Sequence, residues 1–262
     1  MSNEIVRNIL KRLIPQPYRE KLGKTRKQLC DLYYLKWRTP ILVYQMGKVG
    51  SLSVYESLLA CDVKALHLHE MEAPYMREIA RKDQVRIISL VREPIGRHIS
   101  DFFQNFELHT GVAHDQAAFD PATLSKIFLD KKKFWRPSSW FDREMKTQLG
   151  IDVYDYPFPQ EKGYLLIKQG KYEILILKLE LDDTIKEKVI SEFLGLDNFE
   201  LIRKNVAQDK TYAKTYREFK NALRLPEQLI EAMCNARYTR HFYSHTEIEA
   251  MRAKYERPHN KT

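Results

Sequence analysis

The sequence is short of the features that mark several large classes of protein. Its 262 residues include only three cysteines, Cys30, Cys61 and Cys234, which are far apart and odd in number. They predict neither a disulfide framework nor a metal cluster, so a reducing cytoplasm is the expected location. No apolar run approaches the roughly 20 residues that cross a bilayer. The N-terminus lacks the continuous apolar stretch of a signal peptide.

Positive charge is present but unevenly placed. The formal net charge is +9, and residues 1–40 hold ten Lys or Arg against three acids, so 10 − 3 = +7 falls in this leader. A nucleic-acid reader usually spreads its basic residues over a folded face, so no nucleic-acid partner is expected. The leader also has apolar residues at helical spacing: Ile5, Val6, Ile9, Leu10, Leu13 and Ile14.

We interpret residues 1–38 as a basic amphipathic helical leader. Such a helix either packs on the following domain with its basic side in water, or lies on an anionic membrane surface. In the second case residues 1–30 would make a peripheral contact at the inner face of a membrane.

The pattern after the leader predicts one α/β domain over residues 39–262. Short apolar runs alternate with helical patterns, and this βαβαβ order favours a parallel sheet with right-handed crossovers. The predicted strands are Ile41–Gln45, Val63–Leu68 and Val85–Val91, and the predicted helices between them are Leu52–Ala60 and Glu72–Arg81. Further on we expect a helix from Pro94 to about Leu108, a helical insertion over 110–150, a hairpin of 164–168 with 172–179, a helix over 182–194, and a mostly helical part over 205–262.

The first candidate site is the loop from Gln45 to Ser51, which reads Gln-Met-Gly-Lys-Val-Gly-Ser. It lies between a predicted strand and a predicted helix, where free backbone amides and the helix dipole bind anions. An ATP-binding loop places its Lys after the second Gly, whereas Lys48 precedes Gly50. The expected donors are Lys48 and the residues Val49, Gly50, Ser51, Leu52 and Ser53.

A second candidate anion site follows the third predicted strand. Arg92 ends that strand, where its guanidinium can bind a phosphate with two parallel hydrogen bonds. Ser100 lies about two turns into the helix that begins near Pro94, so Arg92 and Ser100 are placed to hold one phosphate from two sides. Arg97, one turn before Ser100, either contributes or faces solvent.

A third cluster, His67, His69 and Glu70, lies at the end of the second predicted strand. Side chains alternate across a strand, so the two histidines share a face if the strand extends that far. Any of the three can act as a general base toward the same cleft as Lys48. No metal is expected, because the sequence offers no further ligand nearby at fitting spacing.

Together these residues resemble the P-loop sulfotransferase superfamily. The Lys48 loop resembles its 5′-phosphosulfate loop, and Arg92-Glu93-Pro94 with Ser100 resembles its 3′-phosphate motif. Ile176-Leu177-Lys178-Leu179-Glu180 resembles a later strand of that family. The resemblance implies a three-layer α/β fold, with a central parallel sheet flanked by helices.

More closely, the chain resembles a group described as capsular polysaccharide synthesis proteins. The likeness lies in Trp140-Phe141-Asp142, Gly150-Ile151-Asp152-Val153-Tyr154, Asn205-Val206-Ala207 and Phe242-Tyr243-Ser244. This group implies a sugar-polymer context rather than a particular reaction.

The sulfotransferase resemblance implies an enzyme that uses 3′-phosphoadenosine 5′-phosphosulfate as its donor. Lys48 and the amides of residues 49–53 would bind the phosphosulfate, and Arg92 with Ser100 the 3′-phosphate. A late loop with Asn205, Lys210 and Tyr212 would close over the nucleotide. The acceptor would be a hydroxyl, on a carbohydrate or polysaccharide, deprotonated by His69 or Glu70, with His67 third. No metal would be needed, because Lys48 and the amides neutralise the charge.

Other readings stay open. A nucleotide-dependent kinase would show the Gly-Lys-[Ser/Thr] order that is missing here. A glycosyltransferase of capsule synthesis would usually show an Asp-x-Asp metal site, for which Asp182-Asp183 is a weak substitute. A non-catalytic membrane module would depend on the leader alone. The family loop also carries two successive hydroxyl residues, whereas Leu52 here separates Ser51 from Ser53.

Overall fold

The computed structural model describes residues 16–113, 119–131, 139–202 and 213–256. Its centre is a five-stranded sheet with the strand order β2-β1-β3-β5-β4. The strands are β1 (Ile41–Tyr44), β2 (Ala65–Leu68), β3 (Val85–Val91), β4 (Tyr164–Gln169) and β5 (Tyr172–Lys178). Four strands run parallel, and β4 pairs antiparallel with β5. The predicted parallel core is confirmed, and the antiparallel edge is the predicted hairpin.

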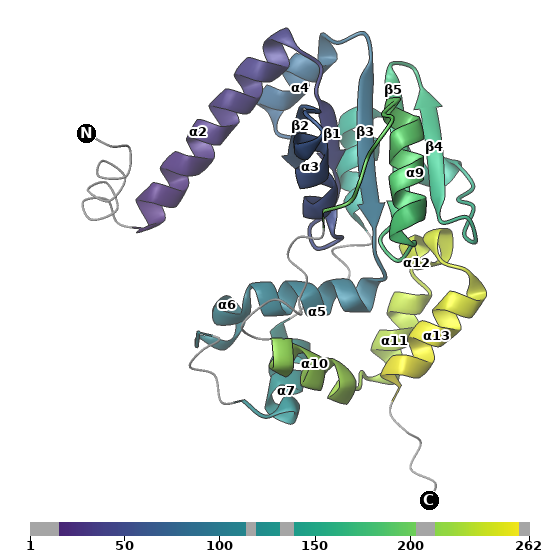
Figure 1. Cartoon of the computed structure of the whole chain (residues 1–262). Helices are drawn as coiled ribbons and strands as arrows, with labels where there is room; N and C mark the ends of the chain where they lie inside the picture. Colours follow the sequence, from purple (N-terminus) through teal and green to yellow (C-terminus); the bar gives the residue numbers. More distant parts are fainter. Residues whose placement is uncertain (1–15, 114–118, 132–138, 203–212, 257–262) are drawn as a thin grey trace, which may run out of the picture.

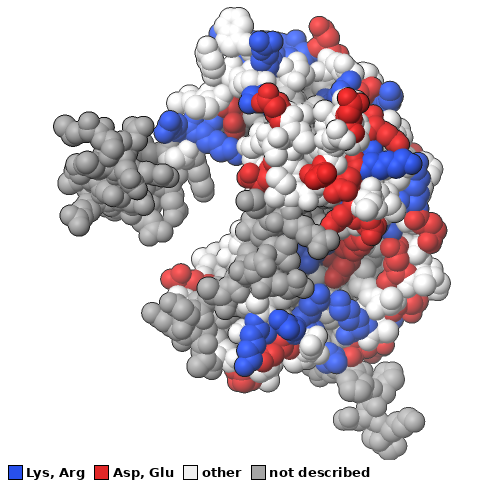
Figure 2. Space-filling model, viewed as in Figure 1, with Lys and Arg blue, Asp and Glu red and all other residues white. Residues whose placement is uncertain are grey.

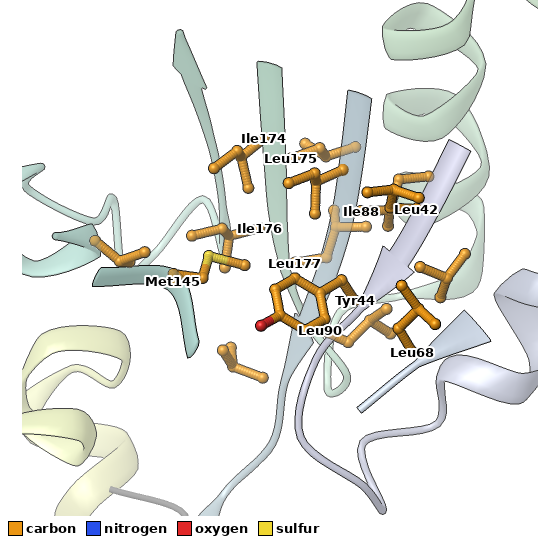
Figure 3. Packing of buried hydrophobic residues seen from close by; sticks show 14 of the residues in the cluster. Leu42, Tyr44, Leu68, Ile88, Leu90, Met145, Ile174, Leu175, Ile176 and Leu177 are labelled. Atoms are coloured by element: carbon orange, nitrogen blue, oxygen red, sulfur yellow. The ribbon is translucent and has the colours of Figure 1, made fainter. Parts of the chain in front are cut away.

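The central strands are apolar because both of their faces are covered. Leu42, Val43 and Tyr44 in β1 are at most 1% exposed, and β3 and β5 are buried to the same degree over most of their length. Figure 3 shows these side chains packed together, with the Tyr44 ring among them.

Helices cover both faces and one edge of this sheet. They are α2 (Gln16–Trp37), α3 (Ser51–Ala60), α4 (Ala73–Ala80), α5 (Pro94–Gln104), α6 (Phe106–Thr110), α7 (Pro121–Lys131), the π-helix η3 (Asp142–Lys146), α8 (Thr147–Leu149), the short η4 (Val153–Asp155), α9 (Asp183–Leu194), α10 (Ala213–Ala222), α11 (Glu227–Cys234), α12 (Arg237–Phe242) and α13 (His245–Tyr255). The chain passes from β1 to β2 on one side and then to β3 on the other. Right-handed crossovers therefore place α3 and α4 on opposite faces.

The carboxyl ends of the parallel strands face a separate group of helices, α5–α7 and α10–α13 (Figure 1). Apart from α12, whose Tyr238 and Phe242 belong to the core of the sheet, these helices have their own core, in which the rings of Phe102, Phe103, Phe128 and Phe219 meet edge to face or stacked. The edge of the sheet and this helical group form the two sides of the region that holds the candidate site.

Several predicted boundaries need correction. The second strand begins at Ala65 rather than Val63, because Val63 donates its N–H to the Leu58 carbonyl in the turn that ends α3. The helix expected to run from Pro94 to about Leu108 is divided at Asn105, whose side chain bonds back to Asp101. In the predicted insertion, α7, η3 and α8 are helical, while residues 132–138 lie outside the described part.

The leader forms a helix whose last turns pack on the domain. Leu35 is 1% exposed, and the Tyr75 hydroxyl of α4 donates to the Asp31 carboxylate. Residues 1–15, including the apolar residues noted above, lie outside the described part of the chain. No helix among the described residues is long and apolar enough to cross a membrane.

Candidate anion-binding site

The site lies where the strand order reverses. β1 has β2 on one side and β3 on the other, although the chain visits β1, β2 and β3 in turn. In open α/β sheets a crevice forms beyond the carboxyl ends of the strands at such a switch point, and ligands bind there. The two segments that border it are the loop after β1, with Lys48, and the end of β3, with Arg92.

The loop has the backbone form of an anion cradle. Lys48 and Gly50 both have positive φ angles, of 73° and 77°, so left-handed residues alternate with ordinary ones before α3 begins at Ser51. Such alternation turns successive N–H groups toward one side, and the first amides of a helix have no partner within it. A Cβ at Gly50 would also meet the end of the Leu179 side chain, which would have to move, so both the positive φ and the limited space favour glycine here.

Two arginines hold this loop from the α5 side. The Arg92 guanidinium donates from Nη1 to the Lys48 carbonyl over 3.1 Å, and Arg97 donates from Nε to the Gly47 carbonyl over 2.9 Å. Arg97 is thus directed at the loop rather than at solvent. From the sequence, the Lys48 loop was expected after the first strand and Arg92 at the end of the third. In the structure the two are in direct contact.

The backbone of Arg92 is fixed by a residue that the sequence did not indicate. The buried Tyr238 hydroxyl accepts from the Arg92 N–H at 3.0 Å and donates to the Arg92 carbonyl at 2.9 Å. Ser100, the other predicted phosphate ligand, is half-buried on α5. It lies one turn beyond Arg97 and therefore on the same side of the helix.

Further positive charge surrounds Arg92. Desolvation lowers the pKa of Lys254, and the nearby charges of Lys220 and Arg92 lower it further, against the opposing effect of Glu93. Lys254 of α13 therefore lies within electrostatic reach of Lys220 in α10, of Arg92 just after β3, and of the opposite charge of Glu93. Figure 2 shows Lys and Arg side chains gathered over the lower helices, on the side of the sheet's carboxyl edge.

His69 has the geometry of a general base. Its Nδ1 lies 3.0 Å from the Gln45 carbonyl, which can only accept, so Nδ1 carries the proton and Nε2 the lone pair. Desolvation is the main cause that lowers the pKa of His69, and the charges of Lys48 and Arg97 lower it further. The ring is therefore neutral near pH 7 and lies within the field of both cations. Its backbone carbonyl accepts from the Trp140 indole N–H at 2.9 Å.

The other two candidate bases are placed differently. His67 Nε2 lies 2.9 Å from the Ser51 hydroxyl, which ties it to the first residue of α3. Desolvation, with the nearby His69 and Lys27, lowers the pKa of His67 to about 4. The centroids of the two histidine rings are 4.8 Å apart, so the rings lie together although β2 ends at Leu68, before His69. Glu70 is exposed in the turn after β2.

A buried carboxylate supports this region, and sequence reasoning missed it. Glu144 Oε2 accepts from the Tyr44 hydroxyl at 2.6 Å and from the Met71 N–H at 2.9 Å, and the residue is 7% exposed. It lies in the π-helix η3, a form that is often found at functional sites. The segment 140–146 holds four charged residues, so its pattern did not single Glu144 out. Both Trp140 and Phe141 are buried in the core.

Within the described ranges, no three His, Cys, Asp or Glu side chains come together as a metal site would need. The late loop expected to close over a nucleotide, with Asn205, Lys210 and Tyr212, lies outside those ranges.

The fold and this site define an α/β protein in which Lys48, Arg92 and Arg97 come together at the switch point of the sheet. Residues 122–244, just under half of the chain, match the family model NKWYS, described as "Putative capsular polysaccharide synthesis protein". This supports the likeness to the capsular polysaccharide group. The match includes Trp140, Glu144 and Tyr238, whereas the Lys48 loop and Arg92 precede it. No curated protein and no solved structure matches the chain.

Proposed function

We propose that this protein is a sulfotransferase that moves a sulfuryl group from 3′-phosphoadenosine 5′-phosphosulfate to a hydroxyl of a carbohydrate or polysaccharide. The observation that carries the proposal is the contact between the Lys48 loop and the Arg92 guanidinium, 3.1 Å from the Lys48 carbonyl. It brings the two candidate anion-binding elements together, and this donor has anionic groups at both ends of its nucleoside.

In the proposed reaction the acceptor hydroxyl attacks sulfur in line with the bridging oxygen. The hydroxyl proton passes to His69 Nε2, the new oxygen–sulfur bond forms, and the bond from sulfur to the bridging oxygen breaks. The leaving group is 3′-phosphoadenosine 5′-phosphate. Lys48 and the first amides of α3 stabilise the charge that develops on the bridging oxygen, an effect worth roughly 3–4 kcal/mol for one well-placed donor.

His69 is our choice of base among the three candidates. Its Nδ1–H is held by the Gln45 carbonyl, and its neutral form leaves Nε2 ready to accept a proton. His67 instead directs its Nε2 to Ser51, and we assign it the orientation of that hydroxyl.

A cavity of about 240 Å³ next to Glu93 can take the nucleoside of the donor rather than its phosphates, because the carboxylates of Glu93, Glu180 and Glu247 line it. Glu93 and Tyr255 both line it. In the part of the chain that the structure describes, Glu93 Oε2 and the Tyr255 hydroxyl are buried without a hydrogen-bond partner. Buried polar atoms of this kind are normally satisfied by protein, water or a ligand. A nucleotide held at Arg92 has hydrogen-bonding groups that can serve them.

Calorimetric titration of the full chain tests the donor. We expect 3′-phosphoadenosine 5′-phosphate to bind without added metal and in preference to ATP with Mg²⁺ or a uridine diphosphate sugar. Lys48→Ala and Arg92→Ala should each weaken binding about ten-fold or more, since a hydrogen bond to a charged group is worth about 1.5–3 kcal/mol. Lys64→Ala, on an exposed lysine paired with Asp62, is the matched control and should bind as the wild type does.

The competing ligands test the two alternative functions, a kinase and a glycosyltransferase, in the same experiment. Preference for ATP with Mg²⁺ would overturn the sulfotransferase in favour of a kinase. Preference for a uridine diphosphate sugar would favour a glycosyltransferase of capsular polysaccharide synthesis. Both alternatives use a nucleotide, but neither uses the 3′-phosphate that we assign to Arg92 and Ser100.

A further inference from the structure

The helix α2 presents two unlike faces. One face packs on the domain: Leu35 is buried, Leu32 contacts the core, and Asp31 accepts from the Tyr75 hydroxyl. The opposite face is exposed and still carries large apolar side chains. Leu29, Tyr33 and Trp37 are 63%, 73% and 66% exposed.

These three residues form one continuous stripe because they are spaced four residues apart. At 3.6 residues per turn they fall, with exposed Arg26, Cys30 and Lys36, within an arc of about 120°. Three of the eight large hydrophobic side chains recorded as exposed in the described residues lie in this stripe. Such a concentration usually marks an interaction surface.

The chemistry of the stripe indicates what it contacts. Trp and Tyr are enriched where a membrane meets water, and Lys and Arg next to them attract anionic headgroups. The sequence of α2 has six basic and two acidic residues, so 6 − 2 = +4, and Arg26 and Lys36 next to the stripe are exposed. Two copies of so positive a helix would repel each other, whereas an anionic lipid surface would attract it.

We propose that the stripe Leu29–Tyr33–Trp37 of α2 docks on the surface of an anionic lipid bilayer. The helix would lie parallel to the membrane, its apolar residues among the headgroups and Arg26 and Lys36 close to phosphate or carboxylate groups. This contact lies on the described helix rather than on residues 1–15, and it is independent of the group-transfer chemistry proposed above.

Co-sedimentation of the full chain with vesicles tests the proposal. We expect binding to phosphatidylcholine vesicles that contain phosphatidylserine, weak binding to phosphatidylcholine alone, and loss of binding as salt rises. The combined variant Leu29→Ser, Tyr33→Ser, Trp37→Ser should bind about ten-fold or more weakly, because three exposed apolar side chains no longer enter the interface.

The matched control is Leu108→Ser with Leu166→Ser, which removes two other exposed leucines, 83% and 45% exposed, on α6 and β4. It should bind vesicles as the wild type does. Unfolding curves check that all variants fold, and these exposed positions should leave the midpoint unchanged. Wild-type binding by the combined variant, or equal loss in the control, would overturn the proposal. The proposal would also be overturned if the wild type formed a dimer and the combined variant did not, because the stripe would then join two copies of the chain.

Discussion

The burial of His67 predicts a measurable acid sensitivity of the fold. Its pKa is about 4 in the folded protein, against about 6.5 for an unperturbed histidine. Between these values the unfolded chain binds a proton that the folded chain does not, so stability falls as pH decreases. Through His67 alone, the free energy of unfolding should be about 2.5 kcal/mol lower at pH 4.5 than at pH 7.5. This value follows from the ratio of the proton-binding terms of the unfolded and folded chains with these two pKa values.

That cost is a large fraction of the roughly 5–15 kcal/mol that stabilises a typical domain. Urea unfolding of the full chain between pH 7.5 and 4.5 measures it, with His67→Gln as the variant. Gln keeps a polar group near Ser51 but binds no proton, so its acid loss should be smaller than that of the wild type by about 2.5 kcal/mol.

When the slopes of the free energy of unfolding against pH are compared between the wild type and His67→Gln, the contributions of the other titrating groups cancel, because both proteins contain them. His245→Gln, at an exposed position that begins α13, is the control and should keep the wild-type acid loss. Equal pH slopes for the wild type and His67→Gln would refute the desolvated environment that the structure gives to His67.

Three further substitutions test the supports of the site by urea unfolding. Gly50→Ala should destabilise the folded protein by more than Gly195→Ala. Both glycines have a positive φ, but of the two only Gly50 would bring a Cβ against a neighbour, Leu179. Equal losses in the free energy of unfolding would contradict this steric argument. Glu144→Ala should cost about 2–5 kcal/mol, because a buried tyrosine hydroxyl and a backbone N–H lose their shared acceptor; a loss typical of a surface site would contradict it. Tyr238→Phe should cost about 1–3 kcal/mol by leaving a buried peptide N–H and carbonyl unpaired, and a neutral effect would show that water replaces the hydroxyl.

Local patterns in the sequence predicted most of the sheet. Short apolar runs such as Ile41–Tyr44 and Val85–Val91 are typical of buried parallel strands, and the glycine turn at Gly170 indicated the hairpin. The boundary errors arose where a turn used residues that pattern alone assigns to a strand or helix. Val63 and Asn105 are examples, and each is decided by a specific hydrogen bond.

The candidate site was only partly predictable. Lys48, Arg92 and His69 were identified because each follows a predicted strand, and parallel strands end at a common edge. Glu144 and Tyr238 were missed because they act from 100 and 146 residues away in the sequence, on elements whose packing the local pattern does not specify. Contacts of this range depend on the tertiary arrangement, which one sequence does not reveal residue by residue.

The way Arg92 is held bears on what the crevice can bind. Its guanidinium donates to a backbone carbonyl, and the ion pairs found among the described residues do not include it. A guanidinium has five N–H donors, and a carbonyl carries no full charge, so this bond orients the cation without itself neutralising it. Lys220 and Lys254 add positive charge near Arg92, and Glu93 opposes it, so a ligand group at Arg92 must carry enough negative charge to gain from the three cations against this carboxylate. A phosphate monoester has this charge, whereas a phosphodiester or a neutral sugar does not, so the affinity of this end of the crevice should follow ligand charge and fall with salt.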